Sequence, residues 1–206
     1  MSEKKLDELR VSLESEMSPK RYGHTLAVER MVARLAELYA PDKAYTLRAA
    51  ALLHDITKEY TVEQHREICA KYGIEIDALT ESAPKTFHAV TAAALIPTLY
   101  PDFADKEIID CVRWHTTARA GISIQEALVY LADYIDDSRT FEDCVELRRF
   151  FWDAEPEKMN AQERIEHLKN TLILSLDMTI SALIFDGNTI STDTFEARNA
   201  LILRGL

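Results

Sequence analysis

The sequence is poor in residues that define several protein classes. Its 206 residues include three cysteines and five glycines. Cys69, Cys111 and Cys144 are far apart and form no CxxC motif, so neither a disulfide framework nor a thiolate zinc site is indicated. We expect them to be buried thiols in a reducing cytoplasm. Glycines are few, and no segment alternates polar and apolar residues for long. The chain therefore shows little of the pattern that is typical of β-strands.

Positive charge and long apolar runs are also scarce. The chain has 24 Lys and Arg against 35 Asp and Glu, a formal net charge of −11. This acidity argues against nucleic acid or an anionic membrane surface as the main partner, but a local metal and a few cations could still bind a small anion. No run reaches the roughly 18 apolar residues of a membrane span, and residues 1–8 lack a signal-peptide core. We expect a cytoplasmic protein.

Helical patterns occupy most of the chain. Its length, 47% hydrophobic and 29% charged residues fit one globular domain. Apolar residues spaced by three and four in residues 1–17 predict a helical appendage to a domain at 18–206. The predicted fold class is all-α, a compact multi-helix fold. Helix starts are predicted from the cap residues Ser18, Asp42, Thr61, Asp105 and Ser123.

Later segments complete this helical prediction. Residues 74–85 are expected to form a loop, and 88–99 a helix that Pro97 bends or ends early. A long helix is predicted over 160–185 and a last one over about 193–204. The aromatic cluster Phe141, Phe150, Phe151 and Trp152 is expected in the core or an interface. His65 and His167 lie among polar residues and are expected to be solvated.

The chemistry is centred on residues 49–58. A helix of small and aliphatic residues ends there in the adjacent pair His54 and Asp55. The two side chains project about 100° apart, yet both can reach one cation at the helix edge. A neutral imidazole and a carboxylate are good ligands for a borderline divalent metal. Further ligands must come from elsewhere, and the candidates are His24, His88, His115 and Asp133.

This pattern resembles the HD-domain metal-dependent phosphohydrolases, which have a His, then a His-Asp pair, then a distant Asp, all on helices. His24, His54, Asp55 and Asp133 match it. The chain is most similar to the YqeK-like family, the HD-type symmetrical diadenosine tetraphosphate hydrolases of bacteria. The resemblance runs from about residue 18 to the C-terminus. It rests on the segments 21–26, 52–55, 114–117, 129–135 and 193–199.

The resemblance implies an HD-domain fold with a metal centre between helices. It also implies a dinucleoside polyphosphate substrate, cleaved between its two middle phosphates to give ADP, with iron as the metal. Two histidines and two carboxylates leave positions open for water and substrate, which suits iron, manganese or another first-row ion. Such an ion lowers the pKa of bound water and polarises a phosphoryl oxygen.

Other residues are expected beside the phosphates. His88 and His115, with Asp55, form the predicted catalytic set; the two histidines act as proton donors or direct contacts, or alternatively hold a second metal. Arg21, one turn before His24, and Lys58, one turn after His54, are cationic phosphate partners. The resemblance adds further substrate-binding candidates: Arg139, Thr194, Arg198 and Asn199.

Two departures from the family pattern are visible. Ala89 stands where the family usually has glycine, and Asp136-Asp137 stands where it has Glu-Pro. Aspartate is one methylene shorter than glutamate, so a contact made from position 136 would be weakened or lost. The four metal ligands are untouched by these changes.

Alternative functions remain open at this stage. One is an HD phosphohydrolase acting on a mononucleotide or on guanosine polyphosphates. Another is a nucleotide-binding sensor with slow turnover. The intact set of four predicted metal ligands speaks against this alternative, because an active site that has lost its function commonly lacks one of them. A purely structural helical module is the remote third. The apolar helix over residues 172–185 and the aromatic cluster could also serve a homodimer.

Overall fold

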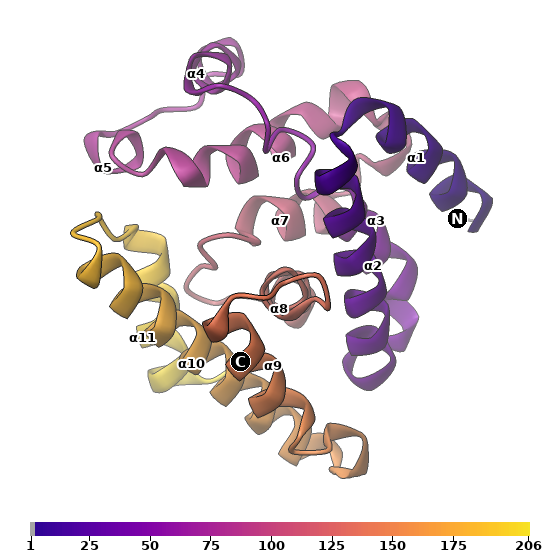
Figure 1. Ribbon diagram of the computed structural model, residues 1–206, viewed down its shortest axis with the longest axis vertical. Coiled ribbons are helices and arrows are strands. Elements are labelled where there is room, and N and C mark those ends of the chain that lie inside the picture. Colours follow the sequence, from indigo (N-terminus) through magenta and orange to yellow (C-terminus); the bar gives the residue numbers. More distant parts are fainter. Residues whose placement is uncertain (1–2) are drawn as a thin grey trace.

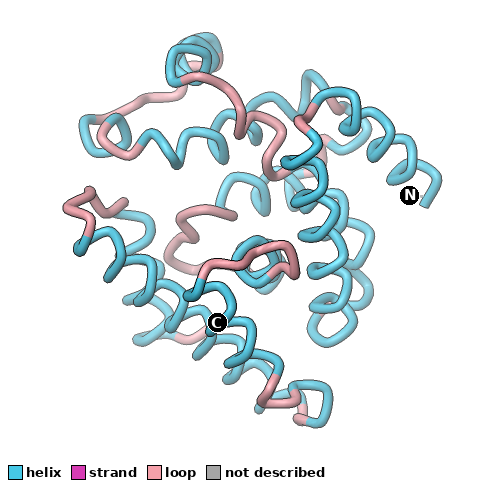
Figure 2. Tube along the Cα trace, viewed as in Figure 1, coloured by secondary structure: helices cyan, strands magenta, loops and turns pink. Residues whose placement is uncertain are grey.

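The computed structural model describes residues 3–206, and this part of the chain is helical and contains no strand (Figures 1 and 2). The all-α prediction is therefore confirmed. The α-helices are α1 (Glu3–Glu16), α2 (Pro19–Tyr39), α3 (Ala44–Leu53), α4 (Val62–Lys71), α5 (Ala78–Glu81), α6 (Phe87–Leu99), α7 (Lys106–Trp114), α8 (Ile124–Ile135), α9 (Glu142–Trp152), α10 (Ala161–Phe185) and α11 (Thr192–Arg204).

Helix α8 lies at the centre of the molecule and is seen nearly end-on in Figure 1. It contacts α2, α3, α7 and α9, and α2 also packs along α3. Helices α4, α5 and α6 form a layer on one side of this centre, and α9, α10 and α11 form another layer opposite. The helices that carry the predicted ligands therefore meet in the middle of the fold.

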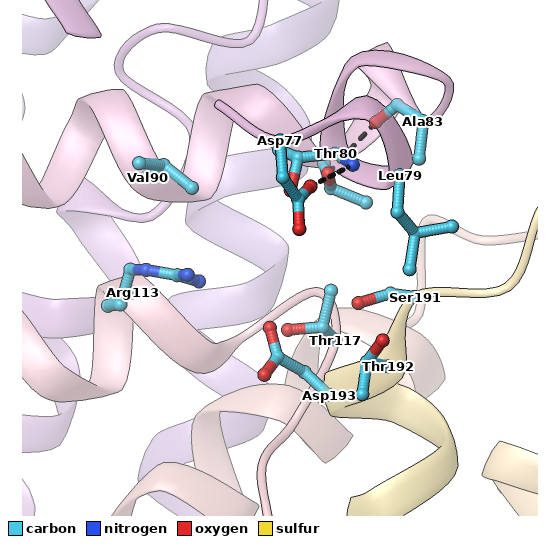
Figure 3. Close-up of a pocket in the computed structure, with 11 residues that line it drawn as sticks. Asp77, Leu79, Thr80, Ala83, Val90, Arg113, Thr117, Ser191, Thr192 and Asp193 are labelled. Carbon is cyan, nitrogen blue, oxygen red and sulfur yellow. Dashed lines mark hydrogen bonds between the residues drawn. The ribbon is translucent and has the colours of Figure 1, made fainter. Parts of the chain in front are cut away.

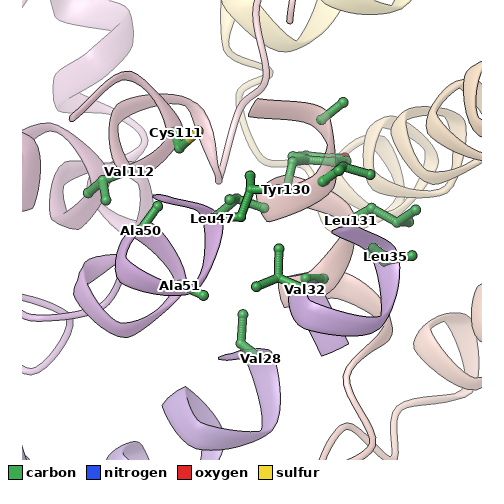
Figure 4. Packing of buried hydrophobic residues seen from close by; sticks show 14 of the residues in the cluster. Val28, Val32, Leu35, Leu47, Ala50, Ala51, Cys111, Val112, Tyr130 and Leu131 are labelled. Atoms are coloured by element: carbon green, nitrogen blue, oxygen red, sulfur yellow. The ribbon is translucent and has the colours of Figure 1, made fainter. Parts of the chain in front are cut away.

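Small side chains allow the central helices to pack closely (Figure 4). Ala49, Ala50 and Ala51 of α3 are fully buried, as are Val28 of α2 and Leu47. An alanine face lets a neighbouring backbone approach, and burial of each larger apolar side chain contributes about 1.5–3 kcal/mol. This packing fixes the end of α3, where the His54-Asp55 pair lies.

Most helix starts follow the predicted caps. Ser18 accepts a hydrogen bond from the Arg21 amide, and Asp105 accepts one from Glu107. Complete capping boxes begin at Thr61 and Ser123. The cap predicted at Asp42 is wrong. Asp42 lies in a 3₁₀ turn, Pro41–Lys43, which leads directly into α3 without a side-chain cap.

Three other segments differ from expectation. Residues 74–85 include the short helix α5 as well as loop, and α6 continues through Pro97 to Leu99. Pro97 lies in the last turn, so the hydrogen bond that it cannot donate and the crowding by its ring affect only the end of the helix. Helix α9 was not predicted because Phe141 at its N-cap offers no side-chain acceptor. The aromatic cluster is divided, with Phe151 buried and Phe141 exposed.

Helix α1 is packed into the main core. Its Leu6, Leu9 and Leu13 are at most 3% exposed and belong to the same buried cluster as the central helices. Arg10 of α1 also forms an ion pair with the buried carboxylate of Glu29 on α2. Residues 1–2 of the predicted appendage lie outside the described range. The division at residue 18 remains a prediction.

Helix α10 is long and apolar enough to span a membrane by length and composition alone, which is weak evidence for a span. Core helices of other proteins pass the same test. Leu168, Leu172 and Leu176 of α10 are buried, and the helix packs on α9 and α11. Its apolar residues therefore contribute to the fold along one face.

Candidate metal centre

The ends of five helices bring the predicted ligands together. His24 lies in the second turn of α2, His88 at the start of α6, and Asp133 in the last turn of α8. His54 and His115 directly follow α3 and α7, each as the C-cap residue. Helix ends place side chains at the border between packed core and cavity, so a polar cluster can form there without interrupting the core.

The carboxylate of Asp55 lies in the middle of this cluster. Its Oδ2 atom is 3.3 Å from His54 Nε2 and 3.7 Å from His24 Nε2. Its Oδ1 atom faces the other way, 3.4 Å from His88 Nε2 and 3.9 Å from His115 Nε2. One carboxylate oxygen of Asp55 therefore faces His24 and His54, and the other faces His88 and His115.

Asp133 completes the first of these sides. Its Oδ1 atom is 2.9 Å from His24 Nε2 and 3.7 Å from His54 Nε2. The ligand atoms of His24, His54 and Asp133 all lie within 4.8 Å of one another, and so do those of His54, Asp55 and His115. The four ligands named from the sequence thus lie in one cluster.

Backbone carbonyls set the orientation of three histidine rings. The Nδ1–H groups of His54 and His115 donate to Ala51 O and Val112 O, each over 2.6 Å. His88 Nδ1 is 2.9 Å from Lys85 O. We assign the proton to Nδ1 in all three from these distances, which leaves each Nε2 lone pair directed into the cluster. Metal-binding histidines are commonly held in this way.

The cluster has the properties of a cation site. His24 Nε2, His54 Nε2 and Asp55 Oδ1 are buried and have no hydrogen-bond partner among residues 3–206. Burial opposes a charge on His54, but the carboxylates of Asp55 and Asp133 overcome it and raise its pKa to about 10. The carboxylates therefore favour positive charge at His54 Nε2, which a proton provides when no metal is bound. A divalent metal supplies it and satisfies the unpaired atoms.

The other two histidines remain neutral. Burial, together with the charge of His54, lowers the pKa of His115 to about 4. Burial, with the neighbouring His115, also holds the pKa of His88 well below its usual range. Both Nε2 atoms can therefore act as metal ligands or hydrogen-bond acceptors at neutral pH.

A cavity of about 400 Å³ adjoins the cluster. His115 and Asp133 form its inner end, and Lys58 and Arg139 add cationic groups. Arg139 pairs with Asp133 through a 2.5 Å contact. Arg21 does not line the cavity but pairs with Asp55 beside it. The lining also includes the carboxylates of Asp143 and Asp186, so an anionic ligand would be bound locally, at the end where the cationic groups and a metal lie.

The predicted C-terminal residues lie elsewhere. The Thr194 hydroxyl donates to Thr117 O over 3.0 Å, and Arg198 pairs with Asp177 over 2.6 Å. Asn199 is half-buried on α11, and none of these three residues lines the 400 Å³ cavity. Their substrate-binding roles remain predictions.

A carboxylate that was not among the predicted site residues lies behind His24. Asp136 is fully buried, with Oδ2 3.4 Å from His24 Nδ1 and Oδ1 accepting from the Ser138 amide over 2.8 Å. The Ser138 hydroxyl, 3.3 Å from the same nitrogen, is the hydrogen-bond partner of the His24 ring, and Asp136 adds a negative charge on the side away from Asp133. The shorter aspartate was expected to weaken or lose a contact from position 136, and yet it reaches the His24 ring. The family pattern names only the metal ligands, so it gave no sign of this supporting contact.

The expectation for His65 was wrong. It is 4% exposed, and its Nδ1 lies 2.8 Å from the Thr91 hydroxyl. Thr57 Oγ1, 2.9 Å from Thr91 Oγ1, donates to His88 O. The polar residues around His65 in sequence cover the outer face of α4, while His65 itself is turned inward. His167 is half-buried, stacks on Phe151 and has its Nε2 2.9 Å from Phe151 O, so it is only partly solvated.

Comparison with known proteins agrees with this geometry. The HD domain family model matches residues 21–137, more than half of the chain. The chain is 29% identical to a Bacillus subtilis protein, "Bis(5'-nucleosyl)-tetraphosphatase, symmetrical", over 95% of this chain and 97% of that one. A protein of the same name from Halalkalibacterium halodurans is 28% identical over 89% of each chain.

A solved structure is also similar. It is described as a predicted HD superfamily hydrolase involved in NAD metabolism from Clostridium acetobutylicum. The TM-score is 0.83 with 30% sequence identity, and the match covers 97% of both chains. The similarity therefore extends over all three helical layers and not only over the ligand-bearing helices.

Proposed function

The chain belongs to the HD domain family, and we propose that it is a metal-dependent phosphohydrolase that cleaves diadenosine tetraphosphate symmetrically into two molecules of ADP. One observation carries the proposal. Unpartnered histidine and carboxylate atoms of His24, His54 and Asp55 meet beside a cavity with cationic groups on its wall. The relatives that match almost the whole chain bear the name of this activity.

His24, His54, Asp55 and Asp133 would hold the metal. When bound, a divalent ion supplies a water of lowered pKa and polarises a phosphoryl oxygen. A donor set of nitrogen and oxygen without thiolate suits iron, manganese or another first-row ion, and the family resemblance leads us to propose iron. Asp136 would keep the His24 ring in place from behind.

Cationic side chains would bind the polyphosphate. Lys58 and Arg139 line the cavity next to Asp133, and Arg21 lies beside Asp55. Their charges offset those of the four phosphates and stabilise charge that develops during hydrolysis. The Thr116 hydroxyl lies 3.1 Å from the Nε2 atoms of both His88 and His115, so it can donate to either of them.

We assign His88 and His115 to the phosphate side of the centre. Lys58 Nζ is 3.1 Å from His88 Nε2, and a cation there disfavours a second divalent ion at the same place. The alternative, a second ion held by His88, His115 and Asp55 Oδ1, is tested by the metal content per chain. One ion agrees with our assignment, whereas two ions that fall to one in His115→Ala would support the alternative.

The activity is tested with protein purified without chelator. Diadenosine tetraphosphate is added with iron(II), manganese or magnesium in separate assays, and ADP is resolved from ATP plus AMP. We expect ADP alone, and its loss in His54→Ala. Asp137→Asn is the matched control, because Asp137 is exposed and four residues from Asp133. ATP plus AMP would contradict symmetrical cleavage.

The absence of any product would contradict the proposal as a whole. A panel of mononucleotides and guanosine polyphosphates then tests the other HD reactions. ADP that binds tightly without turnover in any of the metals would instead indicate a nucleotide sensor. The intact set of four ligands speaks against that outcome.

We further infer a cytoplasmic homodimer. The relatives are bacterial enzymes named for a nucleotide substrate. Exposed apolar side chains occur on α10 and α11, with Phe185 91% and Leu203 79% exposed. Light scattering during size-exclusion chromatography would detect the dimer, and Phe185→Ser should weaken it. A monomer for the unmodified protein would contradict this inference.

A further inference from the structure

A second cavity, of about 140 Å³, lies between α5 and the start of α11 (Figure 3). Arg113 near the end of α7 and Thr117 form its third side. Asp77 and Asp193 face the same space from the other two elements. We call this space the Arg113 cavity. None of its residues belongs to the metal centre described above.

Arg113 has unused hydrogen-bonding capacity. Its guanidinium is half-buried and packs over the Trp114 ring, 4.0 Å from the ring centroid. It makes no side-chain hydrogen bond or ion pair with any residue in 3–206, although Asp193 is the carboxylate that it faces. Stacking fixes the guanidinium plane, so its donors are held at the cavity without a protein partner.

The Arg113 cavity adjoins the larger cavity beside the metal centre. Lys85 and Thr116 line the larger cavity, whereas their immediate neighbours Thr86 and Thr117 line the Arg113 cavity. Consecutive Cα atoms are about 3.8 Å apart. The two cavities therefore adjoin each other along two short segments. These segments are the ones that lead into His88 and away from His115.

Charge indicates which chemical group fits. Arg113 contributes one positive charge, and Asp77 and Asp193 contribute two negative charges, so the formal sum is −1. A phosphate would be repelled, but a neutral group with several hydroxyls could donate to the carboxylates and accept from the guanidinium. A sugar diol has this pattern, and an acidic residue is a common partner of ribose hydroxyls in nucleotide sites.

Size limits the ligand further. An apolar protein cavity of about 150 Å³ holds one benzene molecule. The Arg113 cavity, at about 140 Å³, therefore accommodates the ribose ring of a nucleoside, whose base has to lie outside it. The cavity of about 400 Å³ is large enough for a base together with its sugar.

We propose that the Arg113 cavity binds the ribose of one half of the dinucleoside substrate, while the larger cavity binds the other half. This proposal rests on the function proposed above. The polyphosphate then passes the segments at Lys85–Thr86 and Thr116–Thr117, where His88 and His115 lie. Asp193 accepts from the sugar hydroxyls, and Arg113 donates to them. A substrate with two identical ends thereby occupies two different subsites.

The test compares two substrates that differ by one nucleoside. KM and kcat are measured for diadenosine tetraphosphate and for adenosine 5'-tetraphosphate, whose only nucleoside should occupy the larger cavity. Asp193→Asn and Arg113→Met should each raise KM for diadenosine tetraphosphate about tenfold, because each removes a hydrogen bond to a charged group. Their kcat, and both constants for adenosine 5'-tetraphosphate, should be unchanged.

Arg149→Met is the matched control, since Arg149 is exposed on α9 and distant in sequence from the cavity. Thermal denaturation verifies that each variant folds. An active enzyme whose KM is unchanged in both variants, or is raised equally for the two substrates, would overturn the second subsite alone. Unmodified protein that forms no ADP from diadenosine tetraphosphate would overturn the proposed function, and the subsite with it.

Discussion

The Nε2 atoms of His88 and His115 lie 3.0 Å apart. Both rings give their Nδ1 proton to a backbone carbonyl, so each neutral ring presents a lone pair to the other. Two acceptors at this distance repel unless a donor or a cation lies beside them. Lys58 Nζ and the Thr116 hydroxyl, each 3.1 Å from His88 Nε2, are the donors that the protein provides.

Replacement of Lys58 should reduce turnover without loss of metal. Lys58→Met removes a cation that faces the phosphates, and the loss of one such preorganised donor lowers kcat by about 10²–10³. Steady-state rates and metal content are measured together. Lys71→Met, at an exposed lysine of α4, should leave both unchanged. Loss of metal in Lys58→Met would show that Lys58 supports the centre itself.

Replacement of Asp136 should weaken metal binding. Asp136→Asn keeps an oxygen for the Ser138 amide but removes the charge behind His24, and loss of such an outer partner typically lowers metal affinity about 10–100-fold. Metal titration measures the change. The neighbouring Asp137→Asn is the control. An unchanged affinity would mean that Asp136 only caps the end of α8.

Removal of the metal should lower thermal stability. An ion present at about 100 times its Kd stabilises the folded chain by about 2.7 kcal/mol. For a domain of this size that corresponds to about 5–10 °C in Tm. Differential scanning calorimetry with and without chelator measures the difference. His54→Ala should show no such response to chelator; a full response in that variant would locate the metal elsewhere.

Loss of an α1 leucine should destabilise the whole domain. Leu13 is fully buried, whereas Val11 on the same helix is 70% exposed. Leu13→Ala should lower the free energy of unfolding by about 2–5 kcal/mol in one cooperative transition, and Val11→Ala by less than about 0.5 kcal/mol. Urea denaturation followed by circular dichroism gives both values. A separate early transition would indicate that α1 is an independent appendage.

Helix positions could be predicted where the signal is local. The capping boxes at Thr61 and Ser123 act over three residues, and both are present. The error at Asp42 arose because Pro41 starts a 3₁₀ turn that enters α3 directly. Helix α9 lacks a polar cap, so it depends on burial of Leu147 and Phe151, and this burial becomes visible only in the folded chain.

The candidate site, like the helices, could be predicted only in part from the sequence. The pair His54-Asp55 after an apolar helix indicated a ligand set, and the structure brings His24 and Asp133 to it. The support from Asp136 was not predictable, because it depends on the crossing of α2 and α8. The Arg113 cavity combines three segments between residues 77 and 193, and no single segment carries a recognisable pattern.

The distribution of the four proposed metal ligands over the ends of α2, α3 and α8 has a consequence for biosynthesis. From His24 to Asp133 the ribosome must add 109 residues (133 − 24), which takes roughly 5–20 s at about 5–20 residues per second. During that interval the nascent chain exposes His24, and then His54 with Asp55, without the carboxylate that closes the centre. Stable loading of the metal therefore has to await translation of α8, and a chain that stops before it cannot retain the ion through this set of ligands.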